Sequence, residues 1–473
     1  MTELTFPPSF SWGTATAAYQ IEGARHEGGR RDSIWDTFAH TPGAVVNGDT
    51  GDVTCDHYHR MPSDVALMAS LGLDTYRFSV SWARVCPDGR TPNPEGLDFY
   101  DRLVDELVGR GIRPWLTLYH WDLPQALQDR GGWTNRDTAS AFADYAGAVL
   151  DRLGDRVPVW TTLNEPWCSS FLSYAAGEHA PGHTSPTEAV DAAHHLLLGH
   201  GLAVQRIRAD RPDVTVGITT NHTVADPADP SNPADVDAAR RIDGAFNRVF
   251  LDPLFRGEYP ADVLEDMAEA GLGRAARDGD FAVISSPIDV LGVNYYNGAA
   301  VAGAVPGDES PLVFAGPGGL PRRSPYVGSE RVRFVPRGLP VTAMGWEVQP
   351  EGLTRLLVRL QEEYTGPAGV RLHVTENGAA YDDVPDAAGF VDDTHTRLAY
   401  VRDHLAAVHA AIEAGAAVDG YMVWSMLDNF EWAWGLAKRF GIVRVDFDTL
   451  QRTPKASALW YAEVARSGRV TLD

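Results

Sequence analysis

Short apolar runs recur at long intervals along the chain, and each is followed by a polar turn and then by a segment of helical periodicity. The intervening segments, such as "TASAFADYAGAVLDRLG", place apolar residues three and four positions apart and end on Gly, as amphipathic helices do. The strand-like runs are "FSWGTA" from Phe10, "TYRFSVSW" from Thr75, "PWLTLYHW" from Pro114, "PVWTTLNEP" from Pro158, "VTVGITTN" from Val214, "DVLGVNYY" from Asp289, "RLHVTENG" from Arg371 and "GYMVWSMLDN" from Gly420.

Eight strands that alternate with helices predict an α/β fold, a (β/α)8 TIM barrel with long loops at its C-terminal face. A doubly wound sheet shows the same alternation, but no G-x-G-x-x-G opens a helix after the first strand. Neither an internal repeat nor a low-complexity linker is evident, so residues 1–473 are predicted to form one domain.

The longest stretch without a periodic pattern is residues 298–345, which is rich in Gly, Pro and Arg. In a barrel this segment follows the sixth strand, on the same face as the other strand ends. It is either a surface excursion or a wall of the substrate cleft, and its length favours the cleft wall.

The composition, with 44% hydrophobic and 22% charged residues, is that of a soluble globular protein. Because 64 acidic residues outweigh 40 basic ones, the formal charge of −24 argues against nucleic acid and anionic membranes as partners. Three unpatterned cysteines, no signal peptide and no membrane span predict a cytoplasmic protein. Nothing in the sequence indicates an oligomeric state.

In a barrel, the carboxyl ends of the strands converge on one mouth. The predicted strand ends bear carboxylates, amides, an imidazole and large aromatic rings, without thiol or lysine. They are Arg77, His120, Trp121, Asn164, Glu165, Asn294, Tyr296, Glu376 and Trp424, with Glu431 and Trp432 just beyond the eighth strand.

Two carboxylates that face each other across a cavity can cleave a glycosidic bond. Glu165 ends the fourth strand and Glu376 the seventh, so the barrel can bring them together. We expect Arg77 and Tyr296 to keep Glu376 ionised, whereas low dielectric and the neighbouring charge keep Glu165 protonated. Aromatic faces and the polar groups of Gln20, His120, Asn164 and Glu431 then suit a pyranose ring.

Several other residues have simpler interpretations. His57 and His59 resemble a metal pair but precede a helical segment, so they are expected to be structural, and no metal site is predicted. The adjacent pair His194 and His195 lies in a helix and is expected to be a packing or surface pair. Cys168 is expected to be a small buried apolar residue.

The motifs around these residues resemble glycoside hydrolase family 1, the β-glucosidase family. The resemblance runs from "FSWGTATAAYQIEG" through "TLNEPW", "LGVNYY", "MGWEVQPEGL" and "VTENGAAYDD" to "WSMLDNFEWAWGLAKRFGIVRVDF" and covers nearly the whole chain. It implies a retaining mechanism without metal or cofactor, with Glu165 as acid/base and Glu376 as nucleophile.

The same resemblance assigns the other site residues. Arg77, Asn294 and Tyr296 are expected to support the nucleophile. The expected substrate-binding residues are Gln20, His120, Trp121, Asn164, Trp346, Trp424, Glu431, Trp432 and Phe440.

The expected activity is that of a retaining exo-β-glycosidase, chiefly a β-glucosidase with β-galactosidase or β-fucosidase side activity. Its substrates would be disaccharides, short oligosaccharides such as those from cellulose, or aryl glucosides. A related branch that hydrolyses 6-phosphoglycosides has serine and tyrosine where this chain has Glu431 and Phe440, and a carboxylate at 431 would repel phosphate. The remaining alternatives are a non-catalytic sugar-binding relative and a metal-dependent hydrolase.

Overall fold

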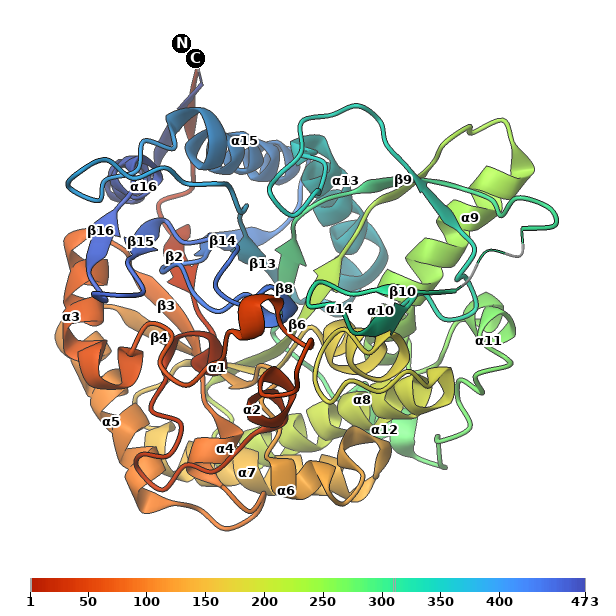
Figure 1. The fold of residues 1–473 in the computed structure, drawn as a ribbon, viewed down its shortest axis with the longest axis horizontal. Helices are drawn as coiled ribbons and strands as arrows, with labels where there is room; N and C mark the ends of the chain where they lie inside the picture. Colours follow the sequence, from red (N-terminus) through yellow and green to blue (C-terminus); the bar gives the residue numbers. More distant parts are fainter. Residues whose placement is uncertain (1, 309, 311, 473) are drawn as a thin grey trace.

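The computed structural model describes residues 2–308, 310 and 312–472, and its centre is a closed barrel of eight parallel strands (Figure 1). Each of the eight predicted runs overlaps one barrel strand to within two residues at either end of the strand, which confirms the predicted fold. The pairing of β14 with β2 and of β6 with β8 completes the ring. The barrel strands are β2 (Ser11–Ala15), β3 (Thr75–Ser79), β4 (Arg113–Tyr119), β5 (Val159–Asn164), β6 (Thr215–His222), β8 (Val290–Tyr295), β13 (Arg371–Asn377) and β14 (Val418–Trp424).

Helices surround the barrel, and the longer ones follow the predicted periodic segments (Figure 1). The outer helices are α3 (His57–Ser70), α5 (Pro94–Gly109), α7 (Asp137–Leu153), α8 (Pro186–Asp210), α9 (Pro233–Asp243), α10 (Val249–Phe255), α13 (Pro350–Leu360), α15 (Ala399–Glu413) and α16 (Ala456–Ser467). Shorter helices are α1 (Ala18–Ile21), α2 (Ile34–Ala39), α4 (Trp82–Val85), α6 (Gln125–Gln128), α11 (Ala261–Asp266), α12 (Asp280–Ile284) and α14 (Gly366–Ala368).

The longest helix, α8, shows how local sequence sets an element's start. Pro186 occupies its first turn, where the missing N–H has no helical partner to lose, and the Ser185 side chain accepts a hydrogen bond from the Glu188 N–H. Leu196, Leu197 and neighbouring residues are fully buried, and the helix packs against α7. Capping and burial thus fix the helix that follows the predicted catalytic strand β5.

The core is continuous from the barrel interior to the layer between strands and helices. Strands β3, β5 and β8 are buried along their whole length, as expected for parallel strands covered on both faces. A hydrogen bond links two neighbouring strands inside the barrel: the Trp115 indole N–H donates to Thr161 Oγ1 at 2.8 Å.

The segment 298–345 has more regular structure than its sequence pattern predicts. The strands β9 (Ala299–Ala302) and β12 (Arg333–Val335) pair with each other, and β9 also pairs with β7 (Ala225–Pro227). A second pair is β10 (Val313–Ala315) with β11 (Pro321–Arg323). Strands of three or four residues are too short to show an alternation of apolar and polar side chains, so only their backbone hydrogen bonds reveal them. Residues 309 and 311 lie outside the described residues.

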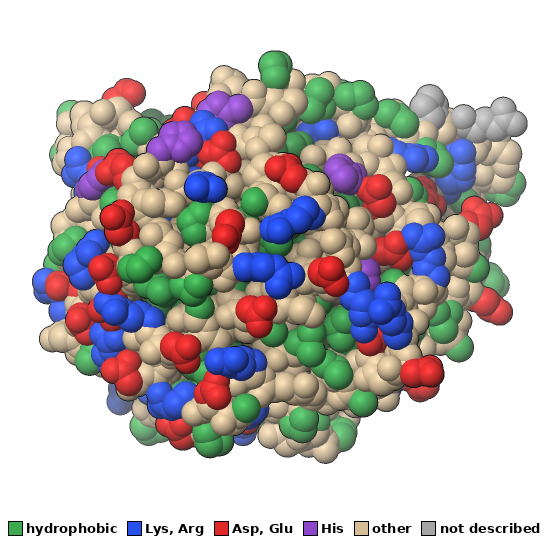
Figure 2. Space-filling model, turned by 90° about the horizontal axis from the view of Figure 1, so that it is seen from below, with side chains coloured by type: hydrophobic (Ala, Val, Ile, Leu, Met, Phe, Trp, Pro, Cys, Tyr) green, Lys and Arg blue, Asp and Glu red, His purple; other side chains and the backbone are tan. Residues whose placement is uncertain are grey.

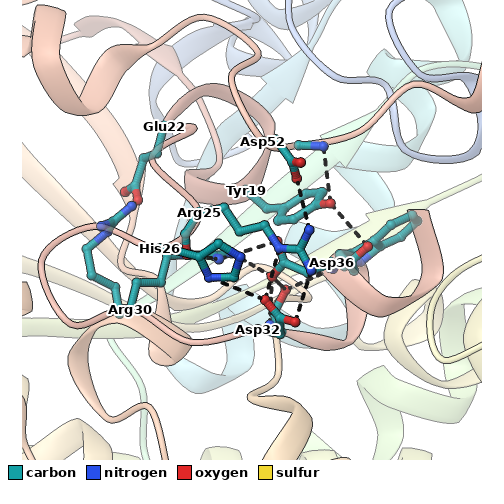
Figure 3. A network of polar contacts seen from close by, with 12 residues as sticks. Tyr19, Glu22, Arg25, His26, Arg30, Asp32, Asp36 and Asp52 are labelled. Carbon is teal, nitrogen blue, oxygen red and sulfur yellow. Dashed lines mark hydrogen bonds and ion pairs between the residues drawn. The ribbon is translucent and has the colours of Figure 1, made fainter. Parts of the chain in front are cut away.

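The loop after β2 folds beside the barrel mouth and is held by a network of ion pairs (Figure 3). Arg25 pairs with Asp32 at 2.9 Å and the buried Arg30 pairs with Asp36 at 2.8 Å. The Tyr19 hydroxyl donates to a backbone carbonyl of α2 at 3.1 Å. These contacts fix α1, which includes the predicted site residue Gln20.

The two ends of the described chain lie together, because β1 (Thr2–Thr5) pairs with β17 (Arg469–Leu472) in antiparallel fashion (Figure 1). A further two-stranded sheet consists of β15 (Val443–Val445) and β16 (Arg452–Pro454). Acidic and basic side chains are interspersed on the face shown in Figure 2. Within the described residues, no helix has the length and apolar character needed to cross a membrane.

Candidate active site

A cavity of about 760 Å³ lies at the carboxyl ends of the barrel strands, and most of the predicted site residues line it. Gln20, Arg77, Asn164 and Asn294 are buried behind its wall. The predicted residues that line it are His120, Trp121, Glu165, Tyr296, Trp346, Glu376, Trp424, Glu431, Trp432 and Phe440. The structure therefore brings together residues drawn from seven of the eight strand ends and the loops beyond them.

Glu165 follows directly on β5 in an unusual backbone conformation. Its φ of 47° lies in the left-handed region that non-glycine residues rarely adopt. Just before it, the pairing of β5 with β6 shifts register between Thr161 and Asn164. Such irregularities re-aim side chains at functional sites. The carboxyl group accepts a hydrogen bond on Oε1 from Asn294 Nδ2 at 2.6 Å.

Glu376 occupies the corresponding position near the end of β13, where the pairing with β8 also shifts register. Arg77 Nη1 lies 2.6 Å from its Oε1, and the Tyr296 hydroxyl donates to its Oε2 at 2.7 Å. The chain then turns at Gly378, where a Cβ atom would lie 1.7 Å from the Trp424 carbonyl oxygen. Only glycine fits this turn, which fixes the end of the strand that supplies the carboxylate.

Hydrogen bonds link the two glutamates through three side chains behind the cavity wall. Arg77 Nη2 and Asn294 Nδ2 both donate to Asn164 Oδ1, at 2.6 and 3.1 Å. The amide of Asn294 is oriented by Thr375, whose hydroxyl donates to Asn294 Oδ1 at 2.7 Å. The network holds both carboxylates rigidly, as a preorganised site requires.

The electrostatic environments of the two glutamates differ. Burial, together with the negative charge of Glu376, raises the pKa of Glu165 to about 8. Burial also raises the pKa of Glu376, but the Arg77 guanidinium and the Tyr296 hydroxyl oppose that rise. The direct ion pair with Arg77 makes Glu376 the group that loses its proton first. At neutral pH the pair of Glu165 and Glu376 therefore holds one carboxylate and one carboxylic acid.

Aromatic rings and polar groups form the inner wall. His120 stacks with Trp424 at 5.8 Å between ring centroids, and Trp121 packs against Trp432 at 4.4 Å. Among the described residues, several buried polar atoms here have no protein partner: Gln20 Oε1, His120 Nδ1 and Glu431 Oε2. An aromatic face beside free donors and acceptors suits a ring that bears hydroxyl groups.

The outer part of the cavity is more apolar. Trp346, Phe440 and Tyr296 pack together at its inner edge, with ring centroids 5.5–6.2 Å apart. The segment 298–345 supplies much of the remaining wall, in agreement with its prediction as a wall of the cleft. Its lining residues include Pro325, Tyr326, Phe334, Leu339, Val341 and Met344.

The polar residues of the cavity wall that were not predicted as site residues include Cys168, Glu178 and Asn221. The expectation that Cys168 is buried is correct, but its role as a merely apolar residue is wrong, because its Sγ lies 3.1 Å from Glu165 Oε2. Its position three residues after Glu165, one turn of a helix, was the available signal. Asn221 lies near the end of β6, where the strand-end rule could also have found it.

The histidines predicted to be structural have protein partners, as expected. His57 is buried against Asp64 at 2.8 Å, and His194 contacts Asp280 at 2.9 Å. His195 hydrogen-bonds to the Trp133 carbonyl oxygen at 2.9 Å. In the part of the chain that the structure describes, no group of three or more His, Cys, Asp or Glu residues is arranged to hold a metal ion.

The closed parallel barrel and the buried pair of glutamates at its mouth define the architecture of a barrel glycoside hydrolase. Comparison with known proteins identifies the family: the model described as "Glycosyl hydrolase family 1" matches residues 2–469. The chain therefore belongs to glycosyl hydrolase family 1, as its motifs indicated.

Similar proteins in this family include β-glucosidases. The chain is 51% identical over 466 residues to thermostable β-glucosidase B of Thermobispora bispora, covering 98% of this chain and 91% of that protein. It is 46% identical to a bifunctional β-D-glucosidase/β-D-fucosidase of Bifidobacterium breve, covering 97% of both. The crystal structure of the psychrophilic β-glucosidase BglU from Micrococcus antarcticus matches with a TM-score of 0.93, at 55% identity and 98% coverage of both chains.

Proposed function

We propose that this protein is a retaining exo-β-glycosidase, chiefly a β-glucosidase, that releases terminal non-reducing β-D-glucosyl residues by double displacement. The observation that supports it most directly is the pair of buried glutamates with opposite surroundings. Glu376 is ion-paired to Arg77, whereas the neighbours of Glu165 are a neutral amide and a thiol. One group is prepared to attack and the other to donate a proton.

In the first step, a Glu376 oxygen attacks the anomeric carbon while Glu165 gives its proton to the glycosidic oxygen. The bond between the anomeric carbon and that oxygen breaks, and a covalent glycosyl–Glu376 ester forms. Arg77 and Tyr296 position the attacking carboxylate. Formation of the ester removes the negative charge of Glu376 from the cavity, so the proton affinity of Glu165 falls.

In the second step, Glu165 acts as a base. It takes a proton from water, whose oxygen attacks the anomeric carbon and releases Glu376 as a carboxylate. Two inversions at the anomeric carbon leave the product with its original β configuration. The lowered proton affinity of Glu165 in the ester state matches its change of role from acid to base.

The inner wall favours a single terminal sugar. Gln20, His120 and Glu431 present their unpartnered polar atoms at the buried end, and the open end is apolar. This arrangement accommodates one hexose innermost and its leaving group toward the segment 298–345. Glu431 disfavours a phosphorylated sugar, because its buried carboxyl group offers a phosphate no positive charge and repels it when ionised.

The proposed substrates are disaccharides, short oligosaccharides such as those from cellulose, and aryl glucosides. Side activity on β-fucosides fits the named activity of the Bifidobacterium breve relative, and β-galactosides differ from glucosides at one hydroxyl. The complex of a 43% identical Thermotoga maritima β-glucosidase with isofagomine lactam, at a TM-score of 0.90 and 99% and 100% coverage, supports a small-molecule ligand. One-domain organisation and a cytoplasmic location are part of the proposal.

Proton NMR of the purified protein with an aryl β-D-glucoside tests this proposal. We expect β-glucose to appear first, followed by slow mutarotation. Initial α-glucose would overturn the double displacement. Absence of turnover in a folded sample, on glucosides, galactosides and their 6-phosphates, would instead favour a sugar-binding protein.

A further inference from the structure

The Cys168 side chain contacts the proposed acid/base, Glu165, directly. Its Sγ lies 3.1 Å from Glu165 Oε2, and Asn221 Nδ2 donates toward the sulfur at 3.5 Å. Asn221 is 9% exposed, its Oδ1 has no described partner, and both residues line the cavity. The thiol is therefore part of the reaction cavity and has a defined orientation.

The backbone fixes this contact. Cys168 begins the π-helix η3 (Cys168–Ala176), and its N–H donates to the Glu165 carbonyl oxygen at 3.0 Å. The left-handed φ of Glu165 lets the chain leave β5 and turn at once into this helix. Glu165 and Cys168 thus lie one turn apart on the same side of the segment.

The neighbours of Glu165 distinguish its two oxygens. Oε1 faces an Asn294 N–H, and that amide cannot reverse, because its own oxygen accepts from Thr375 at 2.7 Å. A proton on Oε1 would point at the amide hydrogen. The transferable proton therefore resides on Oε2, the oxygen beside the sulfur.

We propose that Cys168 is a positioning residue for the acid/base, whose thiol donates to Oε2 of Glu165 whenever that oxygen has given up its proton. This inference rests on the proposed function. When Oε2 bears the proton, that proton is directed to the glycosidic oxygen. In this state the sulfur contacts Oε2 without donating a hydrogen bond to it. After transfer, Oε2 is an anionic acceptor and the S–H bond turns toward it. No covalent bond to sulfur forms or breaks.

A thiol suits this task better than a hydroxyl or a methyl group. As a weak donor it stabilises the carboxylate slightly without opposing reprotonation, whereas a hydroxyl would bind the carboxylate strongly and valine would not bind it. Burial and the nearby carboxylates raise the pKa of Cys168 well above its usual value, so it remains a donor throughout the working range. The charged or titratable groups around the pair are Arg77, Glu178, Tyr296, Tyr326, Glu376 and Glu431.

Two variants of similar size, Cys168→Ser and Cys168→Val, test the proposal through the pH dependence of kcat/KM. On a glucoside with a poor leaving group, we expect the basic limb to move down by about 0.5 pH unit in the serine variant and up by about 0.5 in the valine variant. The acidic limb, which belongs to Glu376, should stay in place. On a dinitrophenyl glucoside, whose leaving group departs without a proton from Glu165, we expect both variants to differ less from the native kcat/KM than they do on the poor leaving group.

A merely structural role would lower activity on both substrates and move neither limb. Basic limbs that stay together, or that move in the same direction in both variants, would overturn the proposal. Circular dichroism establishes that each variant is folded, and Cys168→Ala replaces valine if the larger side chain prevents folding.

An infrared measurement separates this inference from the proposed function. The difference between native and Cys168→Val spectra isolates the S–H stretching band of Cys168 from those of Cys55 and Cys86. We expect this band to move to lower frequency as Glu165 ionises near pH 8, and to stay constant in Glu165→Gln. The shift of the band requires no turnover. An inactive protein that shows the shift would therefore contradict the proposed function but not the hydrogen bond from Cys168 to Glu165. A band that does not respond to pH would overturn the contact.

Discussion

At the scale of residues, the two glutamates differ in their neighbours more than in their burial. Both side chains are nearly inaccessible to solvent, at 5% and 2% exposure for Glu165 and Glu376. Arg77 supplies a positive charge at 2.6 Å to Glu376, whereas the groups that donate to Glu165 are uncharged. In the proposed mechanism, this one arginine therefore decides which glutamate is the acid and which the nucleophile.

The pH profile should follow from this difference. The pKa of Glu165 is raised to about 8, so its acid form is present below that pH and is lost as the pH rises through it. We expect kcat/KM on a poor leaving group to fall above pH 8, and to fall at low pH as Glu376 becomes protonated. Initial rates across pH 4–10 test this; a profile that stays flat to pH 10 would contradict the assignment of Glu165 as acid.

Removal of each glutamate should have a different signature. Glu376→Ala should lose turnover by about 10⁴-fold or more, because no nucleophile remains, and azide should restore part of it as an α-glycosyl azide. Glu165→Ala should lose about 10²–10⁴-fold in kcat/KM on glucosides with poor leaving groups. On glucosides with activated leaving groups, formation of the glycosyl ester should slow much less.

Measured kcat/KM on a dinitrophenyl and an alkyl glucoside separates the two roles. Equal losses for both variants on the activated substrate would exclude the assignment. Glu178→Gln is a matched control, since this carboxylate lines the same cavity without touching either glutamate through a described hydrogen bond.

At the scale of elements, the loop between β2 and α3 depends on a buried ion pair. Arg30 and Asp36 have side chains 5% and 1% exposed, and Asp36 also accepts from the backbone and hydroxyl of Ser33 at the start of α2. Asp36→Ala should destabilise the protein by about 3–5 kcal/mol, because Arg30 is left as an uncompensated buried charge.

The matched control is Asp32→Ala, which removes the partly exposed partner of Arg25 and should cost about 1 kcal/mol or less. Thermal unfolding followed by circular dichroism should show a large fall in Tm only for Asp36→Ala. Equal Tm values for the two variants would mean that the buried pair does not hold the loop.

Sequence periodicity predicted the barrel because each strand is apolar on both faces and is bounded by turns. It predicted that Glu165 and Glu376 would lie close together, because the ends of barrel strands meet at one mouth whatever their separation along the chain. It did not reveal the polar role of Cys168, because that contact depends on the left-handed φ of Glu165, which no local pattern encodes. The short strands of the segment 298–345 were missed because three or four residues cannot show alternation.

At the scale of the whole molecule, the proposed active site occupies one end of the structure, whereas the hydrophobic core extends throughout the barrel and its helices. The barrel and its helices share a continuous core, whereas the reacting groups lie at one end of it, on strand ends and in loops. Trp121, Glu165 and Trp432, three of the described non-glycine residues with positive φ, lie at that end. Regular strands below the mouth support these strained residues.

The concentration of indole rings at the mouth has an optical consequence. Six of the chain's 13 tryptophans line the cavity: Trp121, Trp167, Trp346, Trp424, Trp432 and Trp434. A sugar that enters it displaces solvent from these chromophores, so their emission should change in wavelength and intensity while tryptophans buried elsewhere contribute a constant background. The molecule therefore contains its own fluorescent reporter of occupancy, readable in a Glu376→Ala variant that binds substrate without consuming it.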